Sequence, residues 1–202
     1  VIIFLAVLVN ALGCLIAYFN GSGSIISQML GFPRWVSMLI FLIPAAGVSW
    51  FGLKATGIGA KVLSFGMIII LAILCLATFF SSKVNVNNVL FVNWKYAIPL
   101  FNVAAFSYIG QYLVPDLARG MSHNPKALAP AIVKGMVISG VLLIFIPLSV
   151  LLVNDPKEVT QIATLSWGEA LGLWAFFIAN IYALIAMLTS YWPIKTTIVT
   201  NI

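Results

Sequence analysis

The residues with the greatest capacity for chemistry lie within one otherwise apolar segment, between Tyr96 and Arg119. The polar or conformationally permissive members of this segment are Asn102, Ser107, Tyr108, Gly110, Gln111 and Asp116. Amides and hydroxyls donate and accept hydrogen bonds, but the set contains no nucleophile beside a base. It therefore suits the reversible binding of a polar ligand better than bond cleavage. Polar side chains at membrane depth are costly unless they face a protein interior or a watery cavity.

The same segment carries a helix-breaking pattern. Gly110 weakens a helix, and Pro115 removes a backbone hydrogen bond five residues later. A broken membrane helix is tolerated where its freed backbone groups line a cavity, and half-helix ends there offer amide donors to a carboxylate. The simpler alternative is that these polar groups only bond to neighbouring helices. Their number around one break favours a ligand site near the middle of the membrane.

A second set of oxygen-bearing residues lies near the C-terminal end. Ala186, Thr189 and Ser190 are spaced at i, i+3 and i+4, which places them on one face of a helix. A carbonyl and two hydroxyls suit a hard monovalent cation. The alternative is that the hydroxyls bond back to their own helix, as Ser and Thr often do in membranes. Asn10 is the one strongly polar residue deep in the first apolar run, where we expect it to face a central cavity.

The composition indicates what must surround these residues. Charged residues make up 7% of the chain and hydrophobic residues 63%, whereas charged residues are roughly 25% of a soluble domain. Lipid must therefore replace water around most of the chain. One histidine and four acidic residues leave little for acid–base catalysis, so an enzyme is disfavoured. The lysines and arginines form no cluster typical of nucleic-acid binding.

Six apolar runs are long enough to cross a bilayer, which takes about 20 helical residues. They cover approximately residues 1–19, 35–53, 60–80, 96–118, 130–153 and 169–192. The first is predicted to end at Asn20-Gly21-Ser22-Gly23-Ser24, because such clusters break helices. Asp155, Pro156 and Glu158 form a helix-start pattern, which predicts a short surface helix from Pro156 to Thr164. The predicted fold is an all-α, polytopic bundle of transmembrane helices.

The positive charges predict an orientation, since loops rich in Lys and Arg stay in the cytoplasm. The even-numbered gaps between runs and the C-terminal tail carry six: Lys54, Lys61, Arg119, Lys126, Lys134 and Lys195. The odd-numbered gaps carry four: Arg34, Lys83, Lys95 and Lys157. This bias places the N-terminal end of the first run in the cytoplasm.

Several short motifs, in matching order, resemble amino-acid permeases of the amino acid–polyamine–organocation superfamily, with the closest similarity to its amino acid/auxin permease branch. They are Phe51-Gly52-Leu53-Lys54-Ala55, Phe106-Ser107-Tyr108-x-Gly110, Pro115-Asp116, Asn124-Pro125-Lys126-x-x-x-Pro130-Ala131-Ile132 and Ala186-x-x-Thr189-Ser190. The first looks like the turn between the family's fourth and fifth helices. The resemblance extends along nearly the whole chain.

The resemblance implies that this chain supplies helices three to eight of a ten-helix core built from two inverted five-helix repeats. It implies a secondary active symporter of amino acids in the plasma or cytoplasmic membrane. The family's broken sixth helix binds substrate, and the matching residues here are Phe106, Ser107, Tyr108 and Gly110, with Asn10 added from the first run. The family's first helix is missing, so the chain is expected to be a fragment. A truncated, non-transporting membrane protein and a channel-like bundle remain the alternatives.

The resemblance also bears on the coupling ion. Sodium-coupled members of this fold have a similar arrangement on their eighth helix, which implies sodium at Ala186, Thr189 and Ser190. Some proton-coupled relatives carry a lysine midway along the fifth helix, where this chain has Met67. That departure disfavours a lysine-based proton mechanism, although a proton carried elsewhere, for example by Asp116, stays open. The sequence does not name the amino acid.

Overall fold

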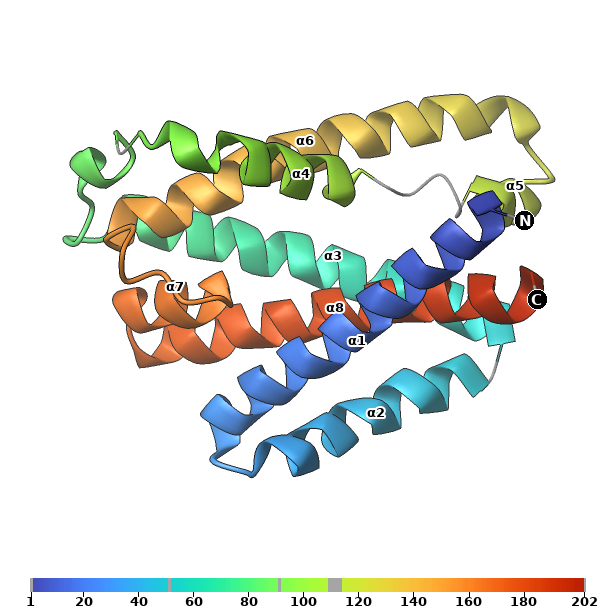
Figure 1. The fold of residues 1–202 in the computed structure, drawn as a ribbon, viewed down its shortest axis with the longest axis horizontal. Helices are drawn as coiled ribbons and strands as arrows, with labels where there is room; N and C mark the ends of the chain where they lie inside the picture. The colour runs from blue at the N-terminus through green and yellow to red at the C-terminus, as the bar shows by residue number, and fades with distance from the viewer. Residues whose placement is uncertain (1, 51, 91, 109–113, 202) are drawn as a thin grey trace.

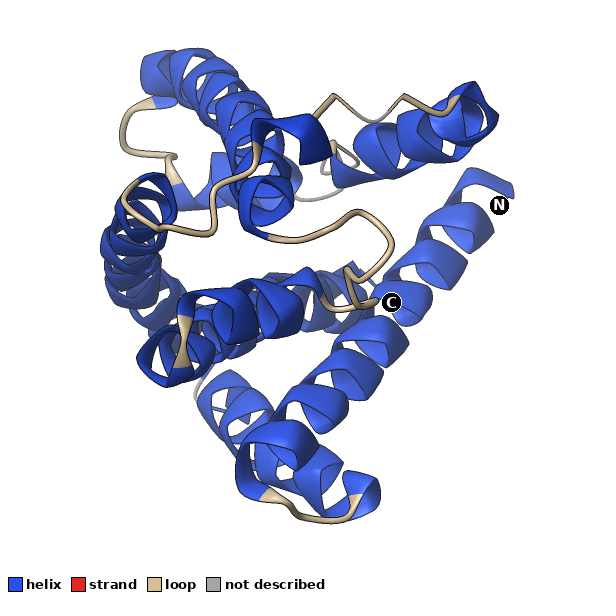
Figure 2. Cartoon of the chain, turned by 90° about the vertical axis from the view of Figure 1, so that its left-hand side faces the viewer, coloured by secondary structure: helices blue, strands red, loops and turns tan. Residues whose placement is uncertain are grey.

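The computed structural model describes residues 2–50, 52–90, 92–108 and 114–201. In these residues the regular elements are helical, as the all-α prediction requires (Figure 2). The α-helices are α1 (Ile2–Leu30), α2 (Arg34–Trp50), α3 (Gly52–Phe79), α4 (Ala97–Ser107), α5 (Val114–Gly120), α6 (Leu128–Val153), α7 (Ala163–Leu171) and α8 (Leu173–Asn201).

The centre of the bundle is formed by α3 and α8, which pack against each other (Figure 1). The short helix α7 folds back against the start of α8, while α1 crosses α8 and packs on α2. The remaining long helix, α6, contacts α3 and α7. By contrast, α4 lies at the periphery and contains no buried residue. The candidate site at the end of α4 is therefore attached to the bundle by few contacts.

Four helical stretches of the described chain are long and apolar enough to cross a membrane. They are Leu8–Leu30, Gly57–Phe79, Pro125–Val153 and Leu173–Lys195. Many large apolar side chains point outward from them, such as Val9, Ile16 and Ile144, which suits contact with lipid. The apolar helix Arg34–Val48 is shorter, and the fourth predicted run is divided between α4 and α5. A total of six spans therefore stays a prediction.

The predicted end of the first span near Phe19 is wrong, because α1 continues to Leu30. The serines of the supposed breaker cluster bond to the helix itself: the Ser22 hydroxyl donates to the Phe19 carbonyl across 3.1 Å, and Ser24 donates to the Asn20 carbonyl across 3.1 Å. The helix ends instead before Gly31, whose positive φ of 73° is typical of a helix C-terminus.

The glycines of that cluster serve close helix packing. A Cβ on Gly21 would lie 2.8 Å from the Cε atom of Met187 in α8, and one on Gly23 would lie 2.5 Å from the Cγ atom of Met38 in α2. Small residues at membrane-helix interfaces let neighbouring helices approach closely. Interhelical packing thus offsets the low helix propensity of glycine in α1.

The predicted surface helix from Pro156 to Thr164 is also wrong. Asp155 does accept a hydrogen bond from the Lys157 amide across 2.9 Å, but the chain then forms a turn and no helix. The helix begins at Ala163. Across its start, the Thr160 amide donates a hydrogen bond to the Ser166 hydroxyl. An Asp two residues before an amide can close a local turn as readily as it caps a helix.

Two further boundaries differ from the sequence expectations. Residues 52–55, expected within a turn, belong to α3, which begins at Gly52; residue 51 lies outside the described part. The sixth predicted span began at Glu169, but Glu169 belongs to α7. Gly172, with a φ of 110°, separates α7 from α8. Only glycine adopts this conformation without strain, so the sharp reversal falls there.

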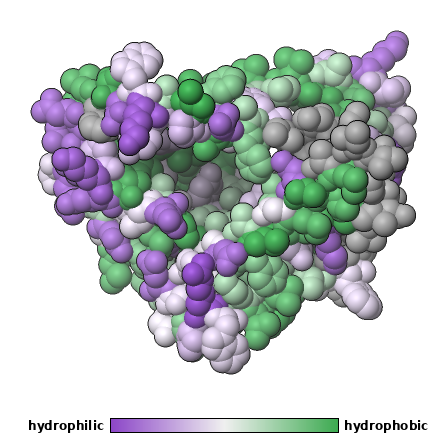
Figure 3. Space-filling view, viewed as in Figure 1, coloured by the Kyte–Doolittle hydropathy of each residue, from purple (hydrophilic) through white to green (hydrophobic). Residues whose placement is uncertain are grey.

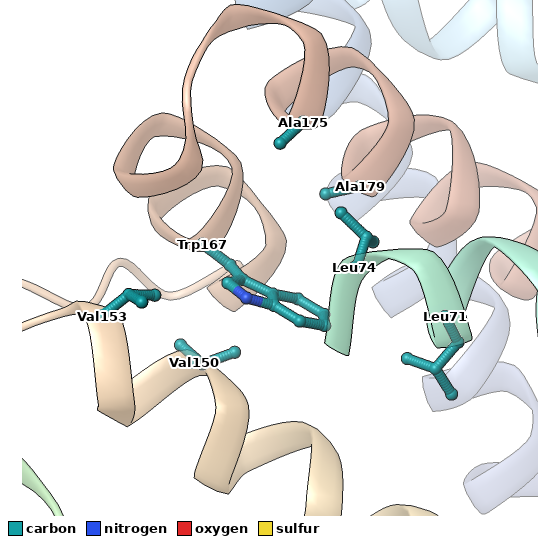
Figure 4. Packing of buried hydrophobic residues seen from close by; sticks show 7 residues of the cluster. All are labelled: Leu71, Leu74, Val150, Val153, Trp167, Ala175 and Ala179. Carbon is teal, nitrogen blue, oxygen red and sulfur yellow. The ribbon is translucent and has the colours of Figure 1, made fainter. Parts of the chain in front are cut away.

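The main apolar cluster lies where four helices meet around Trp167 of α7 (Figure 4). Its other buried members are Leu71 and Leu74 of α3, Val150 and Val153 of α6, and Ala175 and Ala179 of α8. Trp167 is fully buried, and its indole N–H donates to the Thr78 hydroxyl across 2.8 Å. A buried Trp needs such a partner for its N–H group. This cluster makes α3, α6, α7 and α8 one packed unit.

Candidate functional site

The predicted substrate residues lie where α4 ends. Tyr108 closes the helix, and its amide donates to the Ala105 carbonyl across 3.1 Å. The Ser107 hydroxyl donates to the Val103 carbonyl across 2.9 Å. Phe106 keeps 48% of its surface exposed and Tyr108 38%. The end of α4 thus presents two partly exposed aromatic rings.

The break predicted in this segment falls on residues 109–113, outside the described part of the chain, so it stays a prediction. The structure ends α4 at Ser107 and begins α5 at Val114. Gly110 and Gln111 lie outside the described residues, as does the side chain of Asp116. The predicted role of Gly110 therefore stays a prediction.

Tyr108 reaches across to α6. Its hydroxyl donates to the Met136 carbonyl at 3.5 Å, a long bond between residues 28 apart in the chain. The same hydroxyl faces Gly140, where a Cβ would lie 2.5 Å from it. Tyr108, at the end of α4, is therefore held against one place on α6.

The face that carries α4 is hollowed near its middle. Figure 3 shows this hollow in the region that lies between α4 and α8 in Figure 1. Green, apolar surface surrounds much of it, and purple, hydrophilic surface gathers toward the side of the loop that follows α3. A hollow with mixed polarity beside the broken helix is the setting expected of a small-molecule site.

Asn10 has a different neighbourhood, at the crossing of α1 and α8. Its side-chain oxygen accepts a weak hydrogen bond from the Cys14 thiol at 3.7 Å. Cys14 is buried together with Ala11 and with Ile194 of α8. The described contacts thus place Asn10 beside the C-terminal half of α8 and Tyr108 beside α6.

The predicted ion ligands lie in the middle of α8 and are partly buried. The Thr189 hydroxyl lies 2.9 Å from the Ile185 carbonyl and 3.1 Å from the Ala186 carbonyl, to which it donates. This is the local bonding that the alternative interpretation expects. It leaves the lone pairs of the hydroxyl oxygen available, so ion binding is neither supported nor contradicted.

Ser190 is linked to α1. The Tyr18 side chain, which packs on the Cys14 cluster, makes polar contact with Ser190. The crossing of α1 and α8 therefore links Ser190, expected in the ion site, to Tyr18 of α1.

Sequence reasoning missed a second polar network, beneath α7. The Thr164 hydroxyl donates to the side-chain oxygen of Asn180 across 3.2 Å, and the Asn180 amide donates to the Phe176 carbonyl across 2.7 Å. Asn180 is fully buried. The sequence signal for Asn180 was its position deep in an apolar run, which is also the position of Asn10. Its hydrogen-bond partner, Thr164, could not be found from sequence.

Comparison with known families gives a match over most of the chain. The family model described as the tryptophan/tyrosine permease family covers residues 1–191. Neither the curated proteins nor the solved structures contain a match to this chain. The coarser expectation from the motifs, an amino-acid permease, is confirmed, whereas the amino acid/auxin branch and the numbering of helices three to eight stay predictions.

Proposed function

Because the chain belongs to the tryptophan/tyrosine permease family, we propose that it is part of a secondary active symporter for an aromatic amino acid. The coarser part of this conclusion is direct: the chain is an integral membrane protein of a permease family, and its substrate class is amino acids. The single observation that carries the proposal is the family match over residues 1–191.

The end of α4 supports an aromatic substrate. Phe106 and Tyr108, at the end of α4, are both partly exposed. Aromatic rings pair with one another in edge-to-face or offset geometry, and such pairs contribute about 0.5–1.5 kcal/mol beyond area burial. An indole or phenol side chain would gain this interaction, whereas a small aliphatic side chain would not.

For the driving force we propose sodium at Ala186, Thr189 and Ser190, with a proton as the alternative. Spacing on one helix face and the oxygen chemistry of the set support sodium. The proposal includes the inverted-repeat core, with this chain as its helices three to eight, and the cytoplasmic position of the first helix's N-terminal end. It also includes the plasma or cytoplasmic membrane as the location.

The test is transport by the complete protein that contains this chain, purified and reconstituted in liposomes. Radiolabelled tryptophan and tyrosine are offered under an inward sodium gradient, a proton gradient or neither, with leucine as the control substrate. Symport predicts accumulation above equilibrium with sodium and a clear preference over leucine. Equilibration without accumulation would indicate a channel-like bundle, and no uptake of any amino acid would favour a non-transporting protein.

A further inference from the structure

We propose that Gly140 on α6 is a positioning residue for the substrate site, because it provides the place where the Tyr108 hydroxyl rests. This inference rests on the proposed function, in which Tyr108 contacts the substrate. It extends that function to a residue on a different helix, whose own side chain offers no chemistry.

The geometry is specific to one atom. A Cβ built on Gly140 would lie 2.5 Å from the Tyr108 hydroxyl oxygen, and the next atom, the Cζ of the same ring, is 3.9 Å away. A distance of 3.9 Å is an ordinary van der Waals contact, whereas 2.5 Å is too short for a nonbonded contact between carbon and oxygen. A methyl group at position 140 therefore conflicts with the hydroxyl alone.

The contact matters because little else holds this end of α4. No residue of α4 is buried, and the Tyr108 hydroxyl also donates to the Met136 carbonyl on the same helix, α6, at 3.5 Å. The Tyr108 hydroxyl thus donates a hydrogen bond to α6 and lies in the space that Gly140 leaves on the same helix. Together they set the position of the Tyr108 ring beside the helix break.

A methyl group at position 140 would move Tyr108 and leave α6 in place. The conflicting atom is the far end of a rotatable side chain, so a change in the χ1 angle of Tyr108 relieves the overlap at small cost. The helix itself tolerates the change, since alanine has a higher helix propensity than glycine. The displaced ring would then stand away from its binding position.

The experiment compares four variants of the complete permease: Gly140→Ala, Gly135→Ala, Tyr108→Phe, and Gly140→Ala combined with Tyr108→Phe. Gly135 is the matched control, because it lies on the same helix and a Cβ there meets no atom within 4 Å. KM and the maximal rate of tryptophan uptake are measured, with the amount of protein in the membrane determined for each variant.

We expect Gly140→Ala to raise KM about tenfold, within the range of coupling between residues in contact, while the protein level stays normal. Gly135→Ala should have the KM of the unaltered protein. The double variant should return to the KM of Tyr108→Phe alone, because the conflicting oxygen is gone. An unchanged KM in Gly140→Ala, an equal rise in Gly135→Ala, or a double variant as poor as Gly140→Ala would each overturn the proposal.

A second measurement separates this inference from the transport assignment. Fluorotyrosine is incorporated, and the fluorine resonance of Tyr108 is assigned by its loss in Tyr108→Phe. Gly140→Ala should shift this resonance and Gly135→Ala should not. This result depends neither on transport by the unaltered protein nor on the activity of Tyr108→Phe. An unshifted resonance overturns the positioning role, whereas a shifted one in a protein without uptake contradicts only the proposed function.

Discussion

The indole N–H of Trp167 donates to the hydroxyl of Thr78 across 2.8 Å, and both side chains are fully buried. The bond joins α7 to α3, which are 89 residues apart at these positions. Because Thr78 also donates to the Leu74 carbonyl across 2.9 Å, its hydroxyl is used as donor and acceptor at once. The contact fixes α7 on the bundle close to the reversal at Gly172.

Replacing Thr78 by valine should destabilise the protein by about 1–3 kcal/mol, because it leaves the buried Trp167 N–H without its acceptor. Thermal unfolding of the complete protein in detergent measures this loss. Combining Thr78→Val with Trp167→Phe should cost less than the sum of the single changes, since neither polar group then remains. Additive losses of stability would show that this hydrogen bond contributes nothing. Trp174→Phe is the control for losing an indole, since Trp174 is partly exposed.

Gly168→Ala should be more damaging than an ordinary glycine replacement. A Cβ there would overlap the Cα atom of Phe176 and lie 3.0 Å from its nitrogen and 3.1 Å from the Ala175 carbonyl oxygen. These are backbone atoms, which cannot rotate away, so α7 and α8 must separate at a cost of about 1–3 kcal/mol. Gly66→Ala on α3, where a Cβ meets nothing within 4 Å, is the matched control. Equal melting temperatures for the two variants would contradict the close approach of α7 and α8.

The general fold followed from composition and from the length of apolar runs, because both depend only on local sequence. The errors arose where one local pattern is compatible with two structures. Ser22 and Ser24 can end a helix or bond to its carbonyls, and packing of Gly21 and Gly23 against other helices decided in favour of continuity. Asp155 can cap a helix or close a turn, and here it closes a turn.

The candidate site was predictable only in part, for a related reason. The polar and aromatic residues at the end of α4 are visible in the sequence as exceptions within an apolar run. The partner of Tyr108 on α6 is not visible, because Gly140 has no side chain and contributes only the space in which the Tyr108 hydroxyl lies. Contacts between distant segments, such as Thr164 with Asn180, likewise depend on how the helices pack.

Ser190→Ala should raise the sodium concentration needed for half-maximal uptake about tenfold, because it removes one of the proposed oxygen ligands. The rate at saturating sodium should change less. Ser24→Ala is the control, since it also removes one serine hydroxyl from a membrane helix but lies outside the predicted ion set. If uptake by the unaltered protein ignores sodium and follows a pH gradient, the sodium assignment is wrong and a proton takes its place.

Tyr108→Ala and Gly110→Leu should abolish uptake by the complete permease without lowering its amount in the membrane. The first removes the partly exposed ring at the end of α4. The second places a branched side chain at Gly110, which is predicted to break the helix and to belong to the substrate site. Both are assayed with labelled tryptophan against Gly135→Ala, whose new methyl group meets no atom within 4 Å. Normal uptake in both variants would move the substrate site away from the α4–α5 break.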